Sequence, residues 1–269
     1  MTLSHWIGSA TVLYLVSAMV YIGLAVSGRM WLRWPGLVTM GAGFLAHTAA
    51  ISSRVVAAGR LPLTNTYETM LLFAWVLVPL GYWLDRRYRL PALNAFTLPL
   101  VAVALAALSL PQFSSNIEPL MPSLKSNWLL VHVLSCFVAY AAFGVAFGAS
   151  VVWVVYKRLK PSDERRGRQA LLDAITYRAI SFGFPLLTLG IATGAVWANT
   201  CWGRYWNWDP KETWSLVTWL IYGVFLHLRL TTLWQGRWAA WASISGFICV
   251  MVTYLGVNLL YAGYLHAYA

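Results

Sequence analysis

Apolar residues form long runs along this chain, and short polar turns separate them. A transmembrane helix needs about 20 mostly apolar residues. Eight runs approach or exceed that length without an Asp, Glu, Lys or Arg: residues 6–28, 34–53, 69–84, 90–117, 128–156, 179–203, 213–228 and 238–269. The pattern predicts an all-α integral membrane protein, a bundle of about eight transmembrane helices in a single polytopic domain, residues 1–269.

Polar residues just before two of these runs are typical of helix N-termini. Asp209 can cap a helix, Pro210 fits the first helical position, and Glu212 can complete a capping box. The stretch from Asn65 to Glu68 offers a similar cap before the third run. We therefore expect helices to begin in these turns, which makes the two short runs long enough to span.

Composition supports the membrane assignment. The chain is 60% hydrophobic and only 10% charged, whereas soluble domains carry about 25% charged residues. The net charge of +11 is not gathered on a polar face, so nucleic-acid binding is not indicated. The three cysteines are widely spaced, which favours neither a disulfide framework nor a zinc site. The first residues lack the basic region of a cleaved signal peptide, so we expect the first span to be retained.

Basic residues are unevenly divided between the two sides of the predicted bundle. Fourteen of the 19 lysines and arginines lie in one alternate set of connections, and five lie in the other. The positive-inside rule makes the richer set cytoplasmic, so both termini lie on the outer, extracytoplasmic side. The long cytoplasmic connection, residues 157–178, is amphipathic. It is expected either to lie as a helix on the inner leaflet or to bind a partner.

The outer loop between the sixth and seventh runs is unusually aromatic. We call residues 197–214 the tryptophan segment; its aromatic residues include Trp202, Tyr205, Trp206, Trp208 and Trp214. Two interpretations remain open from these residues, an interfacial aromatic belt and a platform for a large flat ligand. Trp202 and Trp206 share one face if the segment is helical.

The five histidines offer candidate metal ligands. His47 and His227 lie inside predicted spans, whereas His132 lies near the outer end of the fifth span and His266 lies in the outer tail. His5, beside Trp6, is interpreted as interfacial. A histidine within the membrane is costly and indicates a functional site or a satisfied interhelical hydrogen bond. The pattern suggests two bis-histidine sites at different depths, and haem iron is commonly held by axial histidine.

His47 and His227 reach similar depths only if their helices continue through Arg54 and Arg229. Arg54 then needs an anionic partner, for which a haem propionate is one alternative. Snorkelling of both arginines towards the membrane surface is the other.

Three blocks of the sequence resemble a known family. WGRYWNWDPKETWSLVTWLIYGVFLHLR, residues 202–229, is similar to the WWD signature of haem-handling proteins of cytochrome c maturation. GRLPLTNTYETMLLFAW (59–75) and WLLVHVLSCFVAY (128–140) resemble further blocks of the CcsA/ResC family of System II. Thr64, Thr66 and Thr69 stand where that family has Ser, Leu and Ser, and none of them is an expected ligand.

The resemblance implies a channel and synthase for haem b in a bacterial cell membrane. Haem would occupy a membrane site held by His47 and His227, then an outer site. The implied outer-site residues are the axial ligands His132 and His266, and a platform of Trp202, Trp206, Trp208 and Asp209. Arg54 and Arg204 are candidate propionate partners.

The family works with a ResB/CcsB-type partner on apocytochrome c, joining haem to a CxxCH motif as a holocytochrome c synthase. Addition of a thiol to a haem vinyl depends largely on proximity and orientation, which suits the residues present. No hydrolase constellation is visible in the sequence. Alternatives are a CcmC-like delivery protein that passes haem to a chaperone, a transporter for another flat ligand, and a structural subunit of a respiratory complex.

Overall fold

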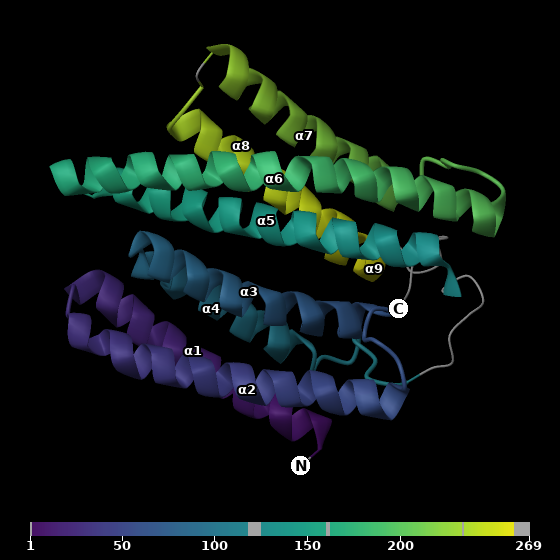
Figure 1. The fold of residues 1–269 in the computed structure, drawn as a ribbon, viewed down its shortest axis with the longest axis horizontal. Helices are drawn as coiled ribbons and strands as arrows, with labels where there is room; N and C mark the ends of the chain where they lie inside the picture. The colour runs from purple at the N-terminus through teal and green to yellow at the C-terminus, as the bar shows by residue number, and fades with distance from the viewer. Residues whose placement is uncertain (1, 118–124, 160–161, 233, 261–269) are drawn as a thin grey trace. The chain divides into compact units, whose positions relative to one another are not determined.

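The computed structural model describes residues 2–117, 125–159, 162–232 and 234–260, and every regular element in these ranges is a helix (Figure 1). Each of the eight apolar runs overlaps one of helices α1 to α8, which confirms the all-α prediction. The elements are α1 (Leu3–Ser27), η1 (Met30–Leu32), α2 (Arg33–Ala58), α3 (Thr66–Tyr88), α4 (Pro91–Ala107), α5 (Asn127–Arg158), α6 (Asp163–Trp202), α7 (Pro210–Thr232), α8 (Arg237–Met251), the π-helical turn η3 (Val252–Gly256) and α9 (Val257–Leu260).

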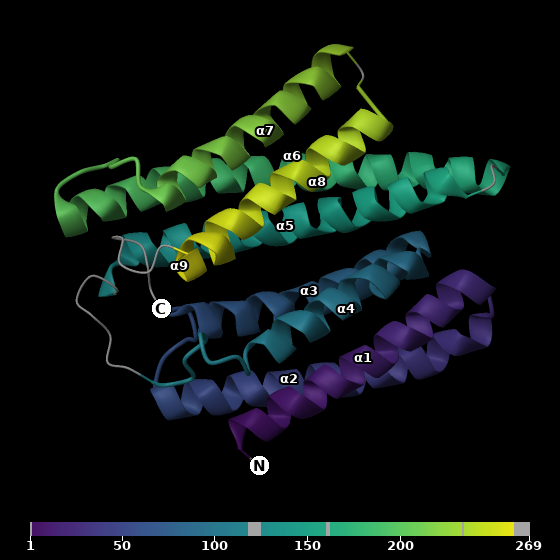
Figure 2. The same ribbon diagram turned by 180° about the vertical axis from the view of Figure 1, so that it is seen from behind.

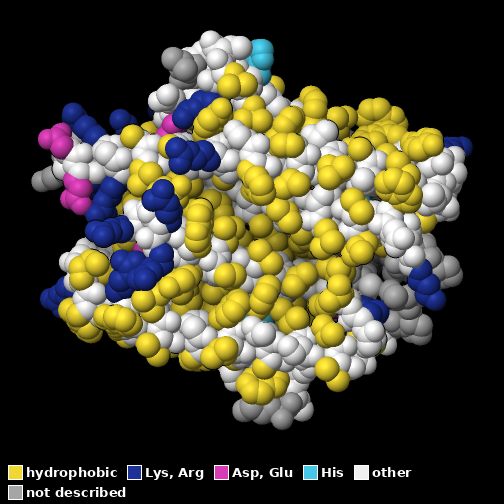
Figure 3. All heavy atoms as spheres, in the orientation of Figure 1, with side chains coloured by type: hydrophobic (Ala, Val, Ile, Leu, Met, Phe, Trp, Pro, Cys, Tyr) yellow, Lys and Arg dark blue, Asp and Glu magenta, His cyan; other side chains and the backbone are white. Residues whose placement is uncertain are grey.

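Several of the helices suit a membrane. In the part of the chain that the structure describes, α1, α3, α5, α6 and the continuous helix of α8 and η3 are long and apolar enough to cross one. Their outward faces expose large hydrophobic side chains, such as Met19 at 64% and Phe182 at 60%. Hydrophobic side chains are spread across the face shown in Figure 3. Soluble monomers rarely expose such extensive apolar surface, so the chain is a multi-pass membrane protein.

The polar connection between α5 and α6 is largely helical. Ser162 caps α6 by accepting the N–H of Arg165 at 3.3 Å, and no proline interrupts residues 163–179. The helix therefore runs without a break into the sixth apolar run and reaches 40 residues. At 1.5 Å per residue this is about 60 Å, roughly twice the hydrocarbon thickness. The described residues of the connection form the end of α5 and the first turns of α6, and its place on the inner leaflet or at a partner stays a prediction.

The described helices form two compact units, α1 to α4 and α5 to α9. In the first unit, α1 packs on α2 and α4, and α3 packs on α4 and α2. In the second unit, α5 packs on α6 and α8, and α7 packs on α8 and α6 (Figure 2). The same order of neighbours thus recurs in both units. The predicted single polytopic domain concerns the whole chain and stays a prediction.

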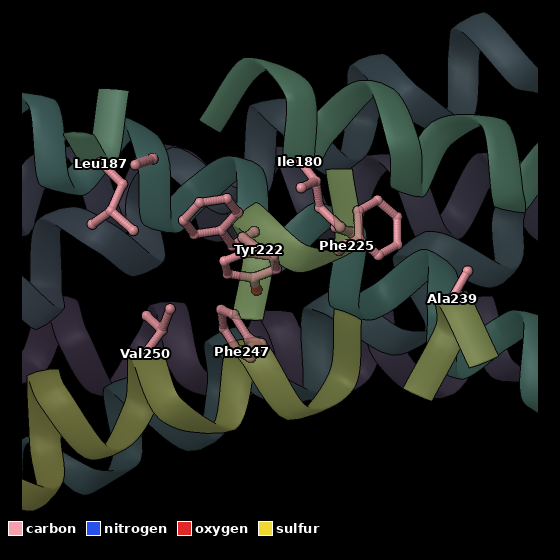
Figure 4. Packing of buried hydrophobic residues seen from close by; sticks show 10 residues of the cluster. Ile180, Leu187, Tyr222, Phe225, Ala239, Phe247 and Val250 are labelled. Carbon is pink, nitrogen blue, oxygen red and sulfur yellow. The ribbon is translucent and has the colours of Figure 1, made fainter. Parts of the chain in front are cut away.

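Stacked aromatic rings fill the core of the second unit (Figure 4). Phe143 of α5 stacks on Tyr222 of α7, with ring centroids 3.9 Å apart. Phe147 of α5 stacks on Phe247 of α8, at 4.8 Å. Such pairs add to the free energy gained by burying the rings. They join three helices of the unit around α5, which carries His132.

A buried carboxylate organises the turn between α2 and α3. The side chain of Glu68 is fully buried, and its Oε1 accepts from the Nε of Arg54 at 3.1 Å and from a terminal nitrogen of Arg54 at 2.9 Å. Its Oε2 accepts from Arg60 at 2.8 Å and from the N–H and hydroxyl of Thr64 at 3.1 and 2.8 Å. Asn65 caps α3, as predicted, by accepting the N–H of Glu68 at 2.8 Å. The turn is therefore held from within by one side chain.

Replacing Glu68 by alanine should destabilise the protein strongly. Breaking a buried ion pair costs about 3–5 kcal/mol because the remaining charge stays buried. Glu164 is the matched control, since its pair with Arg168 is exposed and such pairs contribute below about 0.5 kcal/mol. The measurement is the temperature at which half of the detergent-purified protein remains monodisperse. Equal losses for Glu68→Ala and Glu164→Ala would contradict this account of the turn.

Candidate functional site

The tryptophan segment contains a tight turn between α6 and α7. Gly203 ends α6 in the left-handed region with φ of 72°, and Trp208 also adopts positive φ, at 56°. Asp209 accepts the N–H of Glu212 at 2.8 Å, which confirms its predicted capping role. Glu212 in turn accepts the N–H of Asn207 at 2.7 Å. Left-handed backbone at a residue other than glycine costs about 1–3 kcal/mol and persists only where its surroundings hold it. The two buried carboxylates of the turn provide that support.

The aromatic rings of the segment have different environments. Trp197 is buried and meets Trp202 edge to face at 5.0 Å. Trp206 meets Trp208 edge to face at 5.6 Å, and Trp208 and Tyr205 are exposed at 68% and 59%. Trp202 ends α6 and Trp206 follows the Gly203 turn, so the condition for a shared helical face is not met. The indole Nε1 of Trp206 is buried without a partner among the described residues.

His132 has the arrangement expected of a metal ligand. It lies on α5, half-buried, and its Nδ1 donates to the carbonyl oxygen of Gly190 on α6 at 2.7 Å. A carbonyl only accepts, so the proton of the neutral ring is on Nδ1 and the lone pair is on Nε2. Metal-binding histidines typically hold their second ring nitrogen in this way. Cys136 lies one turn along α5, with its Sγ 3.8 Å from Nδ1.

His47 has a different environment. Its side chain is fully buried, and Nε2 lies 3.0 Å from the carbonyl oxygen of Leu71 on α3, so Nε2 carries the proton. Nδ1 accepts from the hydroxyl of Tyr14 on α1 at 3.4 Å. Both ring nitrogens are thus occupied in an interhelical network, the alternative that the sequence left open. His227 is exposed on α7 in the other unit. Its pairing with His47 stays a prediction.

Both arginines expected at the ends of these helices lie within helices. α2 continues to Ala58 and α7 to Thr232, so the expected continuation through Arg54 and Arg229 is confirmed.

Arg54 binds Glu68 and the carbonyl oxygens of residues 115–116, so each guanidinium nitrogen donates to the protein. Arg229 binds Asp173 and the carbonyl oxygen of Trp234. Each arginine therefore has an acidic partner within the protein, Glu68 for Arg54 and Asp173 for Arg229. The role of Arg54 towards a propionate stays a prediction.

The remaining predicted residues are Arg204 and His266. Arg204 is exposed in the tryptophan segment. His266 lies outside the described residues, so its pairing with His132 stays a prediction.

Two glycines of α6 form the wall beside His132, and the sequence interpretation missed them. A Cβ at Gly194 would lie 2.6 Å from Nδ1 and 2.8 Å from Cε1 of His132, and one at Gly190 would lie 2.5 Å from Sγ of Cys136. The spacing of small residues four apart in GIATG is the available signal, since it permits close helix packing in membranes. These glycines set how closely α5 and α6 approach at His132.

Comparison with known proteins gives a consistent family. The family model described as "Cytochrome C assembly protein" matches residues 63–265. A curated "Cytochrome c biogenesis protein CcsA" of Trichormus variabilis is 32% identical, over 99% of this chain and 98% of that protein. Proteins of the same description from Synechococcus elongatus and Guillardia theta are 36% and 37% identical, covering 92% and 82% of this chain and 91% and 81% of their own lengths.

One solved structure shares the fold. The "Cytochrome c Heme Lyase CcmF" matches 94% of this chain with a TM-score of 0.71 and 17% sequence identity. This chain spans about half of that protein, 47% of its length. At this identity the likeness concerns the fold alone.

Replacing Gly194 by alanine should displace the His132 ring, because the added Cβ would overlap it. If His132 binds haem iron, haem retained per protein should fall about tenfold, the lower end of the loss that follows when a metal ligand's supporting contacts are removed. The measurement is the Soret absorbance of purified protein. Gly223→Ala is the control, since its Cβ would lie no closer than 3.6 Å to any neighbour. Equal haem content in both variants would show that the glycine wall does not position the ligand.

Proposed function

The chain belongs to the cytochrome c assembly protein family, and on that premise we propose that it moves haem b across the membrane and presents it at the outer face. With a ResB/CcsB-type partner it then attaches the haem to CxxCH motifs of apocytochrome c. The family assignment supports the general role in cytochrome c maturation. Transport, presentation and bond formation by this chain are the proposal.

The proposed membrane arrangement has eight spans, α1 to α8, in a bacterial cell membrane with both termini outside. The distribution of basic residues along the sequence supports it, because the positive-inside rule then makes the connections richest in Lys and Arg cytoplasmic. The tryptophan segment faces outward in this arrangement, where apocytochrome c is met.

The hydrogen bond from His132 to Gly190 carries the proposal. It leaves Nε2 of His132 as the nitrogen with a lone pair, on the helix that packs on α6, which leads into the tryptophan segment. A histidine whose second ring nitrogen is held by a backbone carbonyl is a common form of axial ligand to haem iron. His132 and His266 are the proposed axial ligands of the outer site.

Each remaining residue has a proposed part in orienting the ring. Trp202, Trp206 and Trp208 provide the aromatic surface, and Asp209 fixes its turn by capping α7. Arg204, which is exposed, pairs with a propionate. In the reaction the cysteine sulfur bonds to one vinyl carbon and its hydrogen ends on the other, so no oxidant is consumed. The chain contributes orientation and proximity to this addition.

The proposed membrane site at His47 and His227 requires a rearrangement. Nε2 of His47 is held by Leu71 and Nδ1 faces Tyr14. Iron binding through His47 therefore requires one of these bonds to open. Arg54 is held by Glu68, so a propionate at this site needs another partner.

The decisive experiment is co-expression with a ResB/CcsB-type partner and a cytochrome bearing CxxCH, in cells without other maturation proteins. We expect covalent haem on the cytochrome after denaturing electrophoresis, and a bis-histidine haem spectrum in the protein purified under reducing conditions. His132→Ala should weaken both signals at least tenfold. Loss of the contacts that merely orient a metal ligand already lowers metal affinity or activity by about tenfold or more. His5→Ala, at the exposed start of the chain, is the control and should change neither.

The outcomes separate the alternatives. Haem bound without covalent product would favour transport or delivery to a chaperone. Protein that carries no haem from haem-replete cells would overturn the proposal in favour of a structural subunit or another ligand.

A further inference from the structure

A polar contact joins the start of α7 to the last helical turn that the structure describes. The Nζ of Lys211, in the first turn of α7, donates to the Oδ1 of Asn258 on α9 at 2.7 Å. The two residues are far apart in the sequence, and both are half-buried. Lys211 lies between Asp209 and Glu212, the two carboxylates that hold the tryptophan turn. The contact therefore ties that turn to the end of the helical bundle.

The π-helical turn η3 sets the direction of Asn258. A π turn closes through a hydrogen bond one residue longer than that of an α-helix, so it adds one residue to the helix. Each residue of an α-helix turns the chain by about 100°, so the residues after η3 face a direction that an unbroken α8 would not give them. Such single turns recur at functional sites. Here α9 presents Asn258 to α7.

The π-helical turn η3 also packs on α5. Tyr254 within η3 meets Phe137 edge to face, with ring centroids 5.9 Å apart, and lies 6.5 Å from the ring of Tyr140. Both partners lie on α5, just beyond His132 in the sequence. The segment formed by η3 and α9 thus has two attachments in the unit, an aromatic contact to α5, which carries His132, and a polar contact to α7, which follows the tryptophan segment.

We infer that Lys211 and Asn258 are a positioning pair that holds α9 in register with the tryptophan turn and with α5, which carries His132. The inference rests on the proposed function, in which His266, eight residues beyond Asn258, is the second axial ligand. Neither residue touches the iron. They act by limiting where the chain leaves α9, and so where the second ligand is delivered.

The test compares Asn258→Leu and Lys211→Met with the wild-type protein by the spectrum of bound ferrous haem. Loss of the contact should convert six-coordinate low-spin haem into five-coordinate high-spin haem and weaken haem binding about tenfold, as removal of a ligand's supporting bond does. Added imidazole should restore the six-coordinate spectrum, because it can occupy the coordination position that the displaced histidine leaves open. Lys125→Met, an exposed lysine before α5, is the matched control.

Asn258→Asp distinguishes positioning from simple loss of structure. Aspartate keeps the acceptor oxygen facing Lys211 and gains charge attraction, so it should retain the low-spin spectrum. The double variant Lys211→Met with Asn258→Leu should be no worse than either single variant, since both remove one bond.

Each outcome decides a separate claim. Wild-type protein without bis-histidine haem would overturn the proposed function itself. Wild-type protein with that spectrum, together with low-spin spectra in both single variants, would overturn the positioning pair alone. High-spin spectra that imidazole does not restore, or that appear equally in Asn258→Asp, would also overturn it. Monodisperse elution of every variant establishes that folding is retained.

Discussion

A polar group inside an apolar helical bundle needs a partner within the protein, because lipid and hydrocarbon side chains provide none. Apolar faces can pack against one another in many registers. Polar pairing therefore determines which helices are neighbours here more specifically than apolar packing does. Glu68 collects donors from the end of α2 and from the turn before α3. Asp173 on α6 binds Arg229 on α7 and the N–H of Gly236 before α8. Each carboxylate thereby fixes the positions of the segments that bind it relative to one another.

The need for polar partners also explains how the second and third helices of each unit are joined at both ends. These helices are α2 and α3 in the first unit and α6 and α7 in the second. At one end an arginine and an aspartate join them, Arg33 to Asp85 in the first unit and Asp173 to Arg229 in the second, with the charges exchanged between the helices. At the other end a capped turn joins them, with a glutamate three residues after the cap that also accepts an upstream backbone N–H. The tryptophan segment is the turn of the second unit. The position of the tryptophan segment is therefore set by the fold of the unit. Its aromatic residues distinguish it from the corresponding turn of the first unit.

The sequence predicts the parts of this structure that depend on local physics. Apolar runs predict the helices, and Asn65 and Asp209 predict two of their starts, because caps act within one turn of chain. The partner of Arg54 could not be predicted, since Glu68 and residues 115–116 reach it only after three segments have folded together. The Gly203 turn could not be predicted either, because a glycine between tryptophans is compatible with a continued helix. A shared face for Trp202 and Trp206 depends on a continued helix, and in the structure Trp202 precedes the Gly203 turn while Trp206 follows it.

The environments of His47 and His132 show why residue type alone does not identify a ligand. His132 and His47 each place one ring nitrogen against a backbone carbonyl of a neighbouring helix. At His132 that nitrogen is Nδ1, which leaves Nε2 as the acceptor at the far end of the ring, whereas at His47 it is Nε2 and the hydroxyl of Tyr14 faces the acceptor that remains. A ligand that binds through His47 must therefore displace one of two hydrogen bonds, either the one that joins α2 to α1 or the one that joins α2 to α3. That displacement weakens binding by the free energy of the bond. Binding through His132 requires no such displacement. The first unit therefore gains stability from the histidine bond that a ligand would have to break, while in the second unit the bond to Gly190 leaves Nε2 of His132 as the acceptor of the ring.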